Sequence, residues 1–337
     1  MINGHGDDIY NYEGKIVSNF SSNIFSKRNK GLESHLQSKI TAIYNYPSPD
    51  ASQLKKIIAR HEGIKEDSIV ITSGAVEAIY LIASSFGYYT AIQSPTFSEY
   101  EDASIRINKP ICHFQDIDNI PEGTDIIWIC NPNNPDGKVV PVDRLEDLIT
   151  RNRNQMFVID QAYEDYTMEP LFPARAVEKH DNLIIVKSLT KKFSLPGLRI
   201  GYIVAPPFLC KRLKKRMMPW AINALAIEAA TYCYSNLEDF HVDISTLLKE
   251  NERVCQELNK LGISCCESQT NFSLCRLPKG SASELKQFLI DNYGILIRDA
   301  SNFHGLDKRY FRLAVQTPEE NNNLIAAINR WITHQSE

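Results

Sequence analysis

The sequence predicts an α/β protein whose large domain has a mostly parallel central sheet and whose smaller domain is α+β. Short apolar runs alternate with helical patterns over residues 50–205, and after residue 206 the order changes to helices followed by a few strands. Apolar strands separated by helices are typical of a parallel sheet covered on both faces. The chain has 337 residues, of which 43% are hydrophobic, so it can form two packed domains.

The elements follow in order along the chain. Apolar runs predict strands at 68–72, 89–93, 125–130, 156–160, 183–188 and 200–205, and helical periodicity predicts helices at 75–86, 97–107 and 141–153. Residues 207–262 are mainly helical in pattern. The remaining elements are strands at 271–277, 294–299 and 310–315 and helices at 281–293 and 318–334. We therefore predict an N-terminal segment of residues 1–30, a large domain of 31–215 and a small C-terminal domain of 216–337.

Composition and charge argue against several classes of protein. The net charge is −4 without a basic block, which argues against nucleic acid as a partner, and no apolar run reaches the ~20 residues of a membrane helix. The N-terminus lacks the pattern of a signal peptide. The eight cysteines have no regular spacing, and the eight histidines form no known metal motif. We expect a cytoplasmic protein with free thiols and no metal site.

Polar residues that follow the predicted strands are the first candidates for a site, because ligands of a parallel sheet bind at the carboxyl ends of its strands. Gly74, Ala75 and Val76 follow the first strand and open a helix, whose free amides could hold a phosphate, although an ordinary strand–helix turn explains them too. Phe97 follows the second strand and could cover a planar ligand or belong to the core. Each residue alone leaves both interpretations open.

The next strands end in residues with stronger chemical character. Asn134 lies in the rigid loop "NPNNPDG" and could donate a hydrogen bond to a ligand or simply shape a turn. Asp160 ends an apolar strand, so its carboxylate needs a cation or a donor, unless it caps a helix. Tyr163 lies three residues later and could reach the same ligand.

The stretch "LIIVKSLTKKFSLPGLR" brings several positive charges to the end of a core strand. An amine at Lys191, flanked by apolar residues, has its charged form disfavoured and can attack aldehydes. Arg199 would supply a fixed charge for a phosphate. A solvated surface lysine is the alternative for either lysine alone, but the whole set of strand-end residues is hard to assemble by accident.

These motifs resemble those of fold type I pyridoxal-phosphate enzymes, specifically the class I/II aminotransferase family. Ser188, Thr190, Lys191 and Arg199 match its S-x-[ST]-K motif with an arginine eight residues later. The N-P-x-G and D-x-x-Y motifs are matched from Asn134 and Asp160, and the resemblance covers essentially the whole chain. Gln161 and Asp136 depart from the commonest family residues at positions without an assigned role.

The resemblance implies pyridoxal 5'-phosphate as the cofactor and a role for each matched residue. Lys191 is expected to bind the cofactor aldehyde covalently and to transfer protons, and Asp160 to hold the proton on the pyridine nitrogen. The ring would be covered by Phe97 and contacted by Asn134 and Tyr163. The phosphate would be held by Gly74, Ala75, Val76, Ser188, Thr190 and Arg199. Tyr46, in "NYPSPD", implies a homodimer, because its family counterpart reaches the neighbouring subunit's cofactor.

Within this family the sequence is most similar to threonine-phosphate decarboxylases of cobalamin biosynthesis and to histidinol-phosphate aminotransferases. Both imply a small phosphorylated amino-acid substrate, with Arg312 on its carboxylate and Arg298 on its phosphate, although either arginine could pair with a core carboxylate. The stretches "GHG", "NFSSN" and "NFHGLDKRYFRLAVQTPEEN" favour the decarboxylase. They add His5, Ser22 and Asn23, together with Asn134, as expected substrate contacts.

The sequence also departs from the decarboxylase pattern in places, and one other class of function is compatible with the fold. Asp7 and Asp8 replace the glycine and asparagine of the decarboxylase pattern, and "FSKR" replaces its "NPLG" end, so the N-terminal contacts are less well matched than the core. A fold type I domain without turnover, as in regulators fused to a DNA-binding domain, is a different class of function. We expect an enzyme instead, because the recognisable motifs begin within the first few residues and no DNA-binding domain fits beside them.

Overall fold

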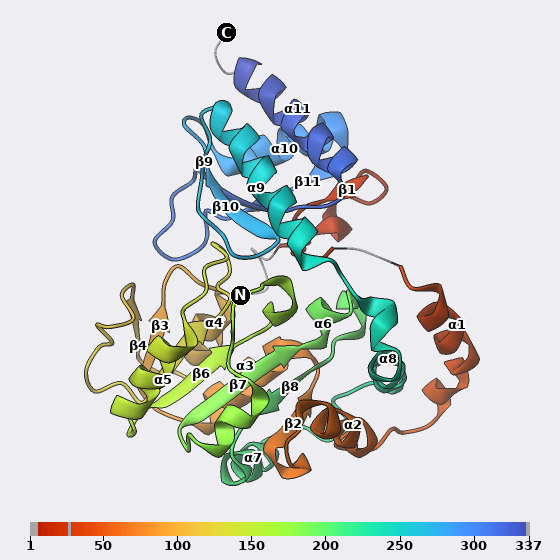
Figure 1. Ribbon diagram of the computed structural model, residues 1–337, viewed down its shortest axis with the longest axis vertical. Coiled ribbons are helices and arrows are strands. Elements are labelled where there is room, and N and C mark those ends of the chain that lie inside the picture. Colours follow the sequence, from red (N-terminus) through yellow and green to blue (C-terminus); the bar gives the residue numbers. More distant parts are fainter. Residues whose placement is uncertain (1–5, 26–27, 335–337) are drawn as a thin grey trace.

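The computed structural model describes residues 6–25 and 28–334, which form two packing units, one above the other in Figure 1. The larger unit is built on a seven-stranded sheet and the smaller one on a four-stranded sheet. None of the helices in the described part of the chain combines the length and apolar character that crossing a bilayer requires. The α/β class predicted from the sequence is therefore confirmed.

The seven-stranded sheet of the larger unit is mixed but mostly parallel. Its order is β2 (Ile69–Thr72), β8 (Gly201–Val204), β7 (Leu183–Ser188), β6 (Met156–Asp160), β5 (Ile126–Cys130), β3 (Thr90–Gln93) and β4 (Ile111–Phe114). Only β8 runs antiparallel to its neighbours. Six of these strands were predicted. The edge strand β4 was not, because "ICHF" is short, includes a histidine and is only partly buried.

Helices cover both faces of this sheet, as its apolar strands require. Apolar side chains of α2 (Ser52–Glu62), α5 (Val142–Arg151) and α8 (Ala224–Ser235) form one core with one face. Those of α3 (Gly74–Ser85), α4 (Glu99–Ile105) and α7 (Pro207–Lys214) pack on the other. Shorter helices lie at α1 (Lys30–Ser38) and α6 (Leu189–Lys192). The 3₁₀ helices are Ile9–Asn11, Ile40–Tyr44, Glu66–Ser68, Glu164–Tyr166, Ala174–Glu178, Pro196–Leu198 and Leu237–Phe240.

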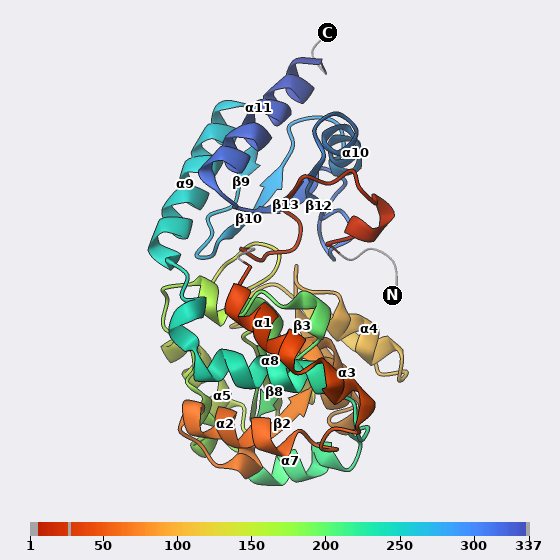
Figure 2. The same ribbon diagram turned by 90° about the vertical axis from the view of Figure 1, so that its right-hand side faces the viewer.

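The smaller unit pairs an antiparallel sheet with three helices. The sheet order is β12 (Arg298–Asp299), β13 (Tyr310–Ala314), β10 (Phe272–Arg276) and β9 (Ser264–Cys265). Figure 2 shows α9 (Ile244–Lys260) beside α11 (Pro318–His334), and α10 (Ala282–Tyr293) also packs against α11. The N-terminal segment joins this unit, because β1 (Ser18–Asn19) pairs with β11 (Ile295–Leu296) and Phe20 enters its core.

Two predicted boundaries can be compared with the structure. The run 294–299 was predicted as one strand, but β11 pairs with β1 and β12 pairs with β13, so the chain changes sheets within it. α8 packs against α1 and α2 in the core of the larger unit, and α9 is the first helix in the core of the smaller one. The predicted limit at 215 falls between α7 and α8, which both pack in the larger unit, and the division into domains stays a prediction.

Candidate active site

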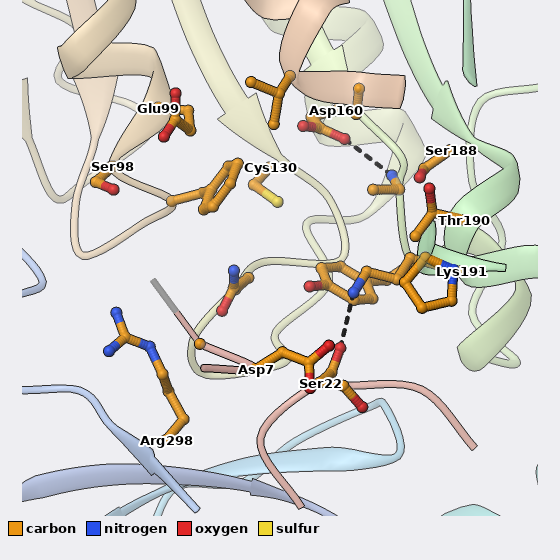
Figure 3. Close-up of a pocket in the computed structure, with 18 of the residues that line it drawn as sticks. Asp7, Ser22, Ser98, Glu99, Cys130, Asp160, Ser188, Thr190, Lys191 and Arg298 are labelled. Atoms are coloured by element: carbon orange, nitrogen blue, oxygen red, sulfur yellow. Dashed lines mark hydrogen bonds between the residues drawn. The ribbon is translucent and has the colours of Figure 1, made fainter. Parts of the chain in front are cut away.

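A cavity of about 420 Å³ lies between the two units, at the carboxyl ends of the parallel strands. Figure 3 shows Asp160 and Lys191 on one side of it and Arg298 on the other. The larger unit contributes Ala75, Val76, Phe97, Ser98, Glu99, Tyr100, Cys130, Asn134, Asp160, Ala162, Tyr163, Ser188, Thr190, Lys191, Pro196 and Arg199. The N-terminal segment and the smaller unit contribute Gly6, Asp7, Ser21, Ser22, Arg298, Asn302, Phe303 and Arg312.

Asp160 lies at the floor of the cavity because it is the last residue of β6. The parallel register places it beside Cys130 of β5, and both side chains are buried. Its carboxylate accepts hydrogen bonds from the Tyr100 hydroxyl at 2.8 Å and from the Ala162 amide at 2.9 Å. Burial raises the pKa of Asp160 to about 6, because a desolvated carboxylate disfavours its charge. A cationic partner placed in the cavity would restore the ionised form.

Tyr100 is a residue of the site that the sequence interpretation missed. It lies on α4, is fully buried, and stacks on Trp128 with ring centroids 5.0 Å apart. The stack fixes the ring so that the hydroxyl reaches Asp160. The sequence pattern predicts that an aromatic residue on a helix belongs to the core. Only the fold reveals that the Tyr100 hydroxyl also contacts Asp160. Besides Tyr100, the lining residues Asp7, Ser21, Ser98, Glu99, Cys130 and Asn302 were also missed.

Lys191 lies on α6, the single helical turn that follows β7. Its Nζ donates to the Ser22 carbonyl at 2.7 Å and lies 5.6 Å from the centre of the Tyr163 ring. Burial, followed by the nearby charge of Arg312, lowers the pKa of Lys191 to about 7. Much of the amine is therefore uncharged at neutral pH, the form that attacks aldehydes. The neighbouring Lys192 pairs with Asp165 at 3.2 Å instead and does not line the cavity.

The predicted phosphate-binding residues gather at one end of the cavity. α3 begins at Gly74, whose φ of +80° disfavours other residues, and a Cβ there would lie 2.8 Å from Nη2 of Arg199. Arg199 is held within 3.5 Å of the Thr190 hydroxyl and 3.2 Å of the Pro196 carbonyl. The first amides of a helix have no partner within it, so α3 adds donors to this cationic end. Ala75, Val76, Ser188 and Thr190 line the same cavity.

Two arginines bring positive charge from the smaller unit. Arg312 is buried and donates to the side-chain oxygen of Asn134 and, at 2.6 Å, to the Ser21 carbonyl. Burial lowers the pKa of Arg312 to about 10, which leaves it charged at neutral pH. Arg298 donates to the Asn302 side-chain oxygen at 2.7 Å and lies over the Phe303 ring. Both guanidinium groups thus lie in the wall opposite Asp160.

The remaining predicted residues fall into three groups. Phe97, Tyr163, Asn134 and Ser22 line the cavity, and buried Asn23 donates to the Tyr163 hydroxyl at 3.3 Å from just behind the wall. Tyr46 does not line it: its side chain is 88% exposed and its ring packs against Trp220. His5 lies outside the described residues.

Asp7 is an acidic residue at the edge of a largely cationic wall. Its amide donates to the Ser21 hydroxyl at 2.9 Å, and its carboxylate accepts from the Asn19 side chain at 2.5 Å. The neighbouring Asp8 turns away to pair with Lys286 at 2.6 Å. Of the two acidic departures from the decarboxylase pattern, only Asp7 lines the cavity.

Fold and site together define a member of one large enzyme family. Residues 15–328 match the family model described as aminotransferase class I and II, and the chain belongs to that family. Its members use pyridoxal 5'-phosphate, and the residues of the cavity fit this group. An amine of low pKa, a buried carboxylate and a cationic helix end match its aldehyde, pyridine nitrogen and phosphate.

Three relatives are similar over most of the chain. The crystal structure of L-threonine-O-3-phosphate decarboxylase from Porphyromonas gingivalis is 36% identical, with a TM-score of 0.92 over 94% of this chain and all of that one. A histidinol-phosphate aminotransferase of Thermoanaerobacter pseudethanolicus is 30% identical over 87% of this chain and 86% of its own length. An adenosylcobalamin biosynthesis bifunctional protein of Leptospira interrogans is 32% identical over 94% of this chain, which spans 39% of it.

Proposed function

We propose that this protein is a pyridoxal-phosphate-dependent decarboxylase that converts L-threonine O-3-phosphate into (R)-1-aminopropan-2-yl phosphate and carbon dioxide. The observation that carries the proposal is the pair of buried arginines, Arg298 and Arg312, in the same cavity as Lys191. Two guanidinium groups suit an amino acid with two anionic ends. The decarboxylase from Porphyromonas gingivalis, which is 36% identical, is named for this substrate.

The larger unit supplies the residues for the cofactor. When bound, pyridoxal phosphate provides an electron sink for the pair left behind when a bond at the substrate Cα breaks. Asp160 holds the proton on the pyridine nitrogen, and Phe97, Asn134 and Tyr163 position the ring. Lys191 holds the aldehyde, for which its lowered pKa suits it. Arg199, with the first turn of α3, Ser188 and Thr190, holds the phosphate.

The smaller unit and the N-terminal segment hold the substrate. Arg312 binds its carboxylate and Arg298 its phosphate, with His5, Ser22, Asn23 and Asn134 as further contacts. Because only a bond perpendicular to the cofactor ring breaks easily, the two arginines select the reaction by the way they turn the substrate. Decarboxylation breaks the bond from Cα to the carboxylate and leaves an electron pair at Cα. Lys191, in its ammonium form, then delivers a proton to that carbon.

Histidinol-phosphate aminotransferase activity is the second candidate, favoured by relatives that are 30% identical over 87% of the chain. In that reaction Lys191 removes the Cα proton, and the amino group passes to 2-oxoglutarate. Histidinol phosphate has a phosphate ester in place of the carboxylate, so Arg312 would serve the keto acid instead. The two reactions therefore use the same arginine at different steps.

Dimerisation and cellular context belong to the same proposal. Tyr46 would reach the cofactor of the neighbouring subunit in a homodimer. The surface around Tyr46 is apolar and exposed: Trp220 contacts its ring, and Ile40, Ile43 and Tyr44 lie near it in sequence. Such a surface is expected where a second subunit covers it. We place the enzyme in cobalamin biosynthesis, as the name of the Leptospira relative suggests. All eight cysteines are free thiols, which suits a reducing cytoplasm.

The experiment follows carbon dioxide from carboxyl-labelled L-threonine O-3-phosphate, with the cofactor present and without a keto acid. The proposal predicts release of label and formation of one aminopropanol phosphate per carbon dioxide. Parallel reactions contain histidinol phosphate with 2-oxoglutarate. Formation of glutamate there, without carbon dioxide from threonine phosphate, would replace the proposal by the aminotransferase.

A further inference from the structure

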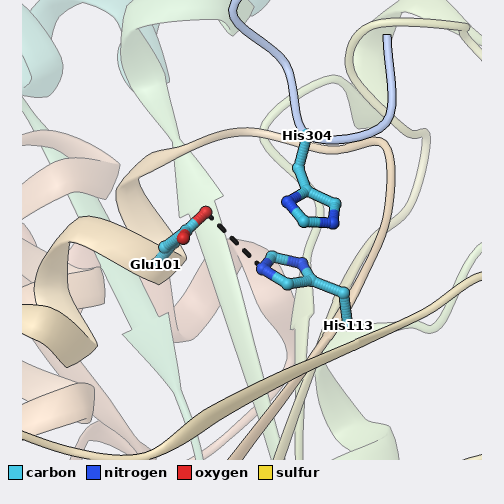
Figure 4. A group of neighbouring side chains, drawn as sticks. All are labelled: Glu101, His113 and His304. Carbon is cyan, nitrogen blue, oxygen red and sulfur yellow. Dashed lines mark ion pairs between the residues drawn. The ribbon is translucent and has the colours of Figure 1, made fainter.

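Three potential metal ligands from distant parts of the sequence meet outside the cofactor cavity. Glu101 lies on α4, His113 on the edge strand β4, and His304 in the loop that follows β12 (Figure 4). Each offers one donor atom, and the three atoms lie within 4.8 Å of one another. Two imidazoles and a carboxylate form a common donor set for zinc, with a fourth position open to water.

We propose that Glu101, His113 and His304 form a Zn²⁺ site that joins the two units beside the active-site cavity. This proposal is independent of the reaction proposed above. The two units meet here because Glu101 and His113 belong to the larger unit, whereas the loop of His304 is anchored in the smaller one. That anchor is the apolar cluster of Leu274, Ala300 and Phe303.

His113 is already held in the orientation that a metal ligand requires. Its Nδ1 lies 2.6 Å from the Ser94 hydroxyl, and its Nε2 lies 3.6 Å from the Glu101 carboxylate. In the tautomer whose Nδ1 donates to Ser94, Nε2 presents a lone pair toward Glu101. A hydrogen bond at the other nitrogen orients metal-binding histidines in this way.

His304 supplies the adjustable ligand. Its ring stacks on His113 with centroids 3.7 Å apart and planes 8° from parallel. Parallel stacked rings direct their lone pairs side by side, so His304 must turn to bring a nitrogen onto the same ion. The side chain is exposed, which leaves room for that rotation. The cluster is thus close to a binding geometry and needs one surface side chain to move.

A metal ion here would connect the two sides of the cavity, the side with Asp160 and Lys191 and the side with Arg298 and Arg312. Residues next to the ligands line the cavity on both sides: Glu99 and Tyr100 precede Glu101 on α4, and Asn302 and Phe303 precede His304. Arg298 donates to Asn302, so the fastened loop also carries a partner of a substrate arginine. The expected consequence is a loop held more firmly beside the substrate.

The test measures Zn²⁺ binding to the full-length protein with cofactor bound, after chelator dialysis, in competition with a chromophoric chelator. His304→Ala should bind the ion at least tenfold more weakly, since even the loss of an outer partner of a ligand costs about that much. The matched control is His35→Ala, because His35 also pairs with a glutamate, Glu228, at 3.4 Å but belongs to no group of three possible ligands among the described residues. This control should bind zinc like the unmodified protein.

Cobalt separates this site from thiols that bind zinc elsewhere. With Co²⁺, the unmodified protein should show the visible d–d bands of a nitrogen- and oxygen-ligated ion, and both His304→Ala and Glu101→Gln should lose them. Circular dichroism establishes that the variants are folded. Superimposable zinc titrations for the unmodified protein and His304→Ala would overturn the proposal, as would an equal loss in His35→Ala.

Discussion

The two walls of the cavity differ in the kind of charge they carry. The larger unit supplies groups that titrate near neutrality, with the pKa of Asp160 at about 6 and that of Lys191 at about 7. The smaller unit supplies Arg298 and Arg312, and even the lowered pKa of Arg312, about 10, leaves it charged. Burial acts on all of these groups, but only the first wall can exchange protons at neutral pH. We infer that one wall does the proton chemistry and the other orients the substrate.

The largest expected effect comes from removing the amine of the cofactor wall. Lys191→Ala should lower turnover by roughly a thousandfold or more, since it removes both the cofactor link and the proton donor. Lys192→Ala, which breaks the pair with Asp165 and the contact with the Phe193 ring outside the cavity, should keep most of the activity. Borohydride reduction and peptide mapping should place the pyridoxyl group on Lys191. A label on Lys192 would contradict the roles assigned to Lys191 and to the cofactor-binding residues around it.

Asp160→Asn should retain bound cofactor but lose turnover by roughly a hundredfold to a thousandfold, comparable to the removal of one preorganised electrostatic contact. The amide keeps the shape of the side chain but cannot hold the proton on the pyridine nitrogen. Steady-state rates together with the visible absorbance of the cofactor separate the two effects. Near-normal turnover would mean that Asp160 is not the partner of the pyridine nitrogen.

Mixing inactive subunits tests whether the cofactor wall is completed by a second chain. Tyr46→Ala and Lys191→Ala are combined after subunit exchange has been demonstrated by mass spectrometry. Random pairing of equal amounts should restore about a quarter of the normal sites, because half of the dimers are mixed and each has one intact site. Absence of any recovery would argue that Tyr46 serves its own chain or no site.

A smaller effect should follow from Tyr100→Phe, which preserves the stack on Trp128 but removes the hydrogen bond to Asp160. That bond stabilises the carboxylate, so its loss should raise the pKa of Asp160 further. The ionised form, present above the pKa, should then be lost at a higher pH as the solution is acidified. We expect a decrease in rate of about tenfold and an acid limb of the pH profile that moves upward. An acid limb at the same pH in Tyr100→Phe would show that the Tyr100 hydroxyl does not set the pKa of Asp160.

The two walls also differed in how far the sequence could predict them. Asp160 ends one buried strand and Lys191 lies three residues after another, so the strand pattern predicted that they would lie at the same edge of the sheet, and the cavity contains both. Arg298 and Arg312 were found by resemblance to a family, because nothing local indicates that β12 and β13 face the cofactor wall. Tyr100 looked like a core residue, which it also is. The domain boundary near 215 stays a prediction, because a helix pattern does not reveal which sheet the helix covers.

The cluster of Glu101, His113 and His304 shows the same limit more sharply. Its members span Glu101 to His304 and lie in an unpredicted edge strand, a helix and a loop, so no spacing rule connects them. The sequence predicted no metal site for this reason. Only the packing of one unit against the other brings these side chains together.

The division of labour between the walls is tested most directly by a matched pair of arginine removals. In Arg199→Ala and Arg298→Ala, the affinity for pyridoxal phosphate and the KM for threonine phosphate at saturating cofactor are both measured. The account predicts that Arg199→Ala weakens the cofactor by roughly tenfold to a hundredfold and leaves KM nearly unchanged, and that Arg298→Ala does the reverse. Loss of cofactor affinity in Arg298→Ala, with KM unaffected, would contradict it.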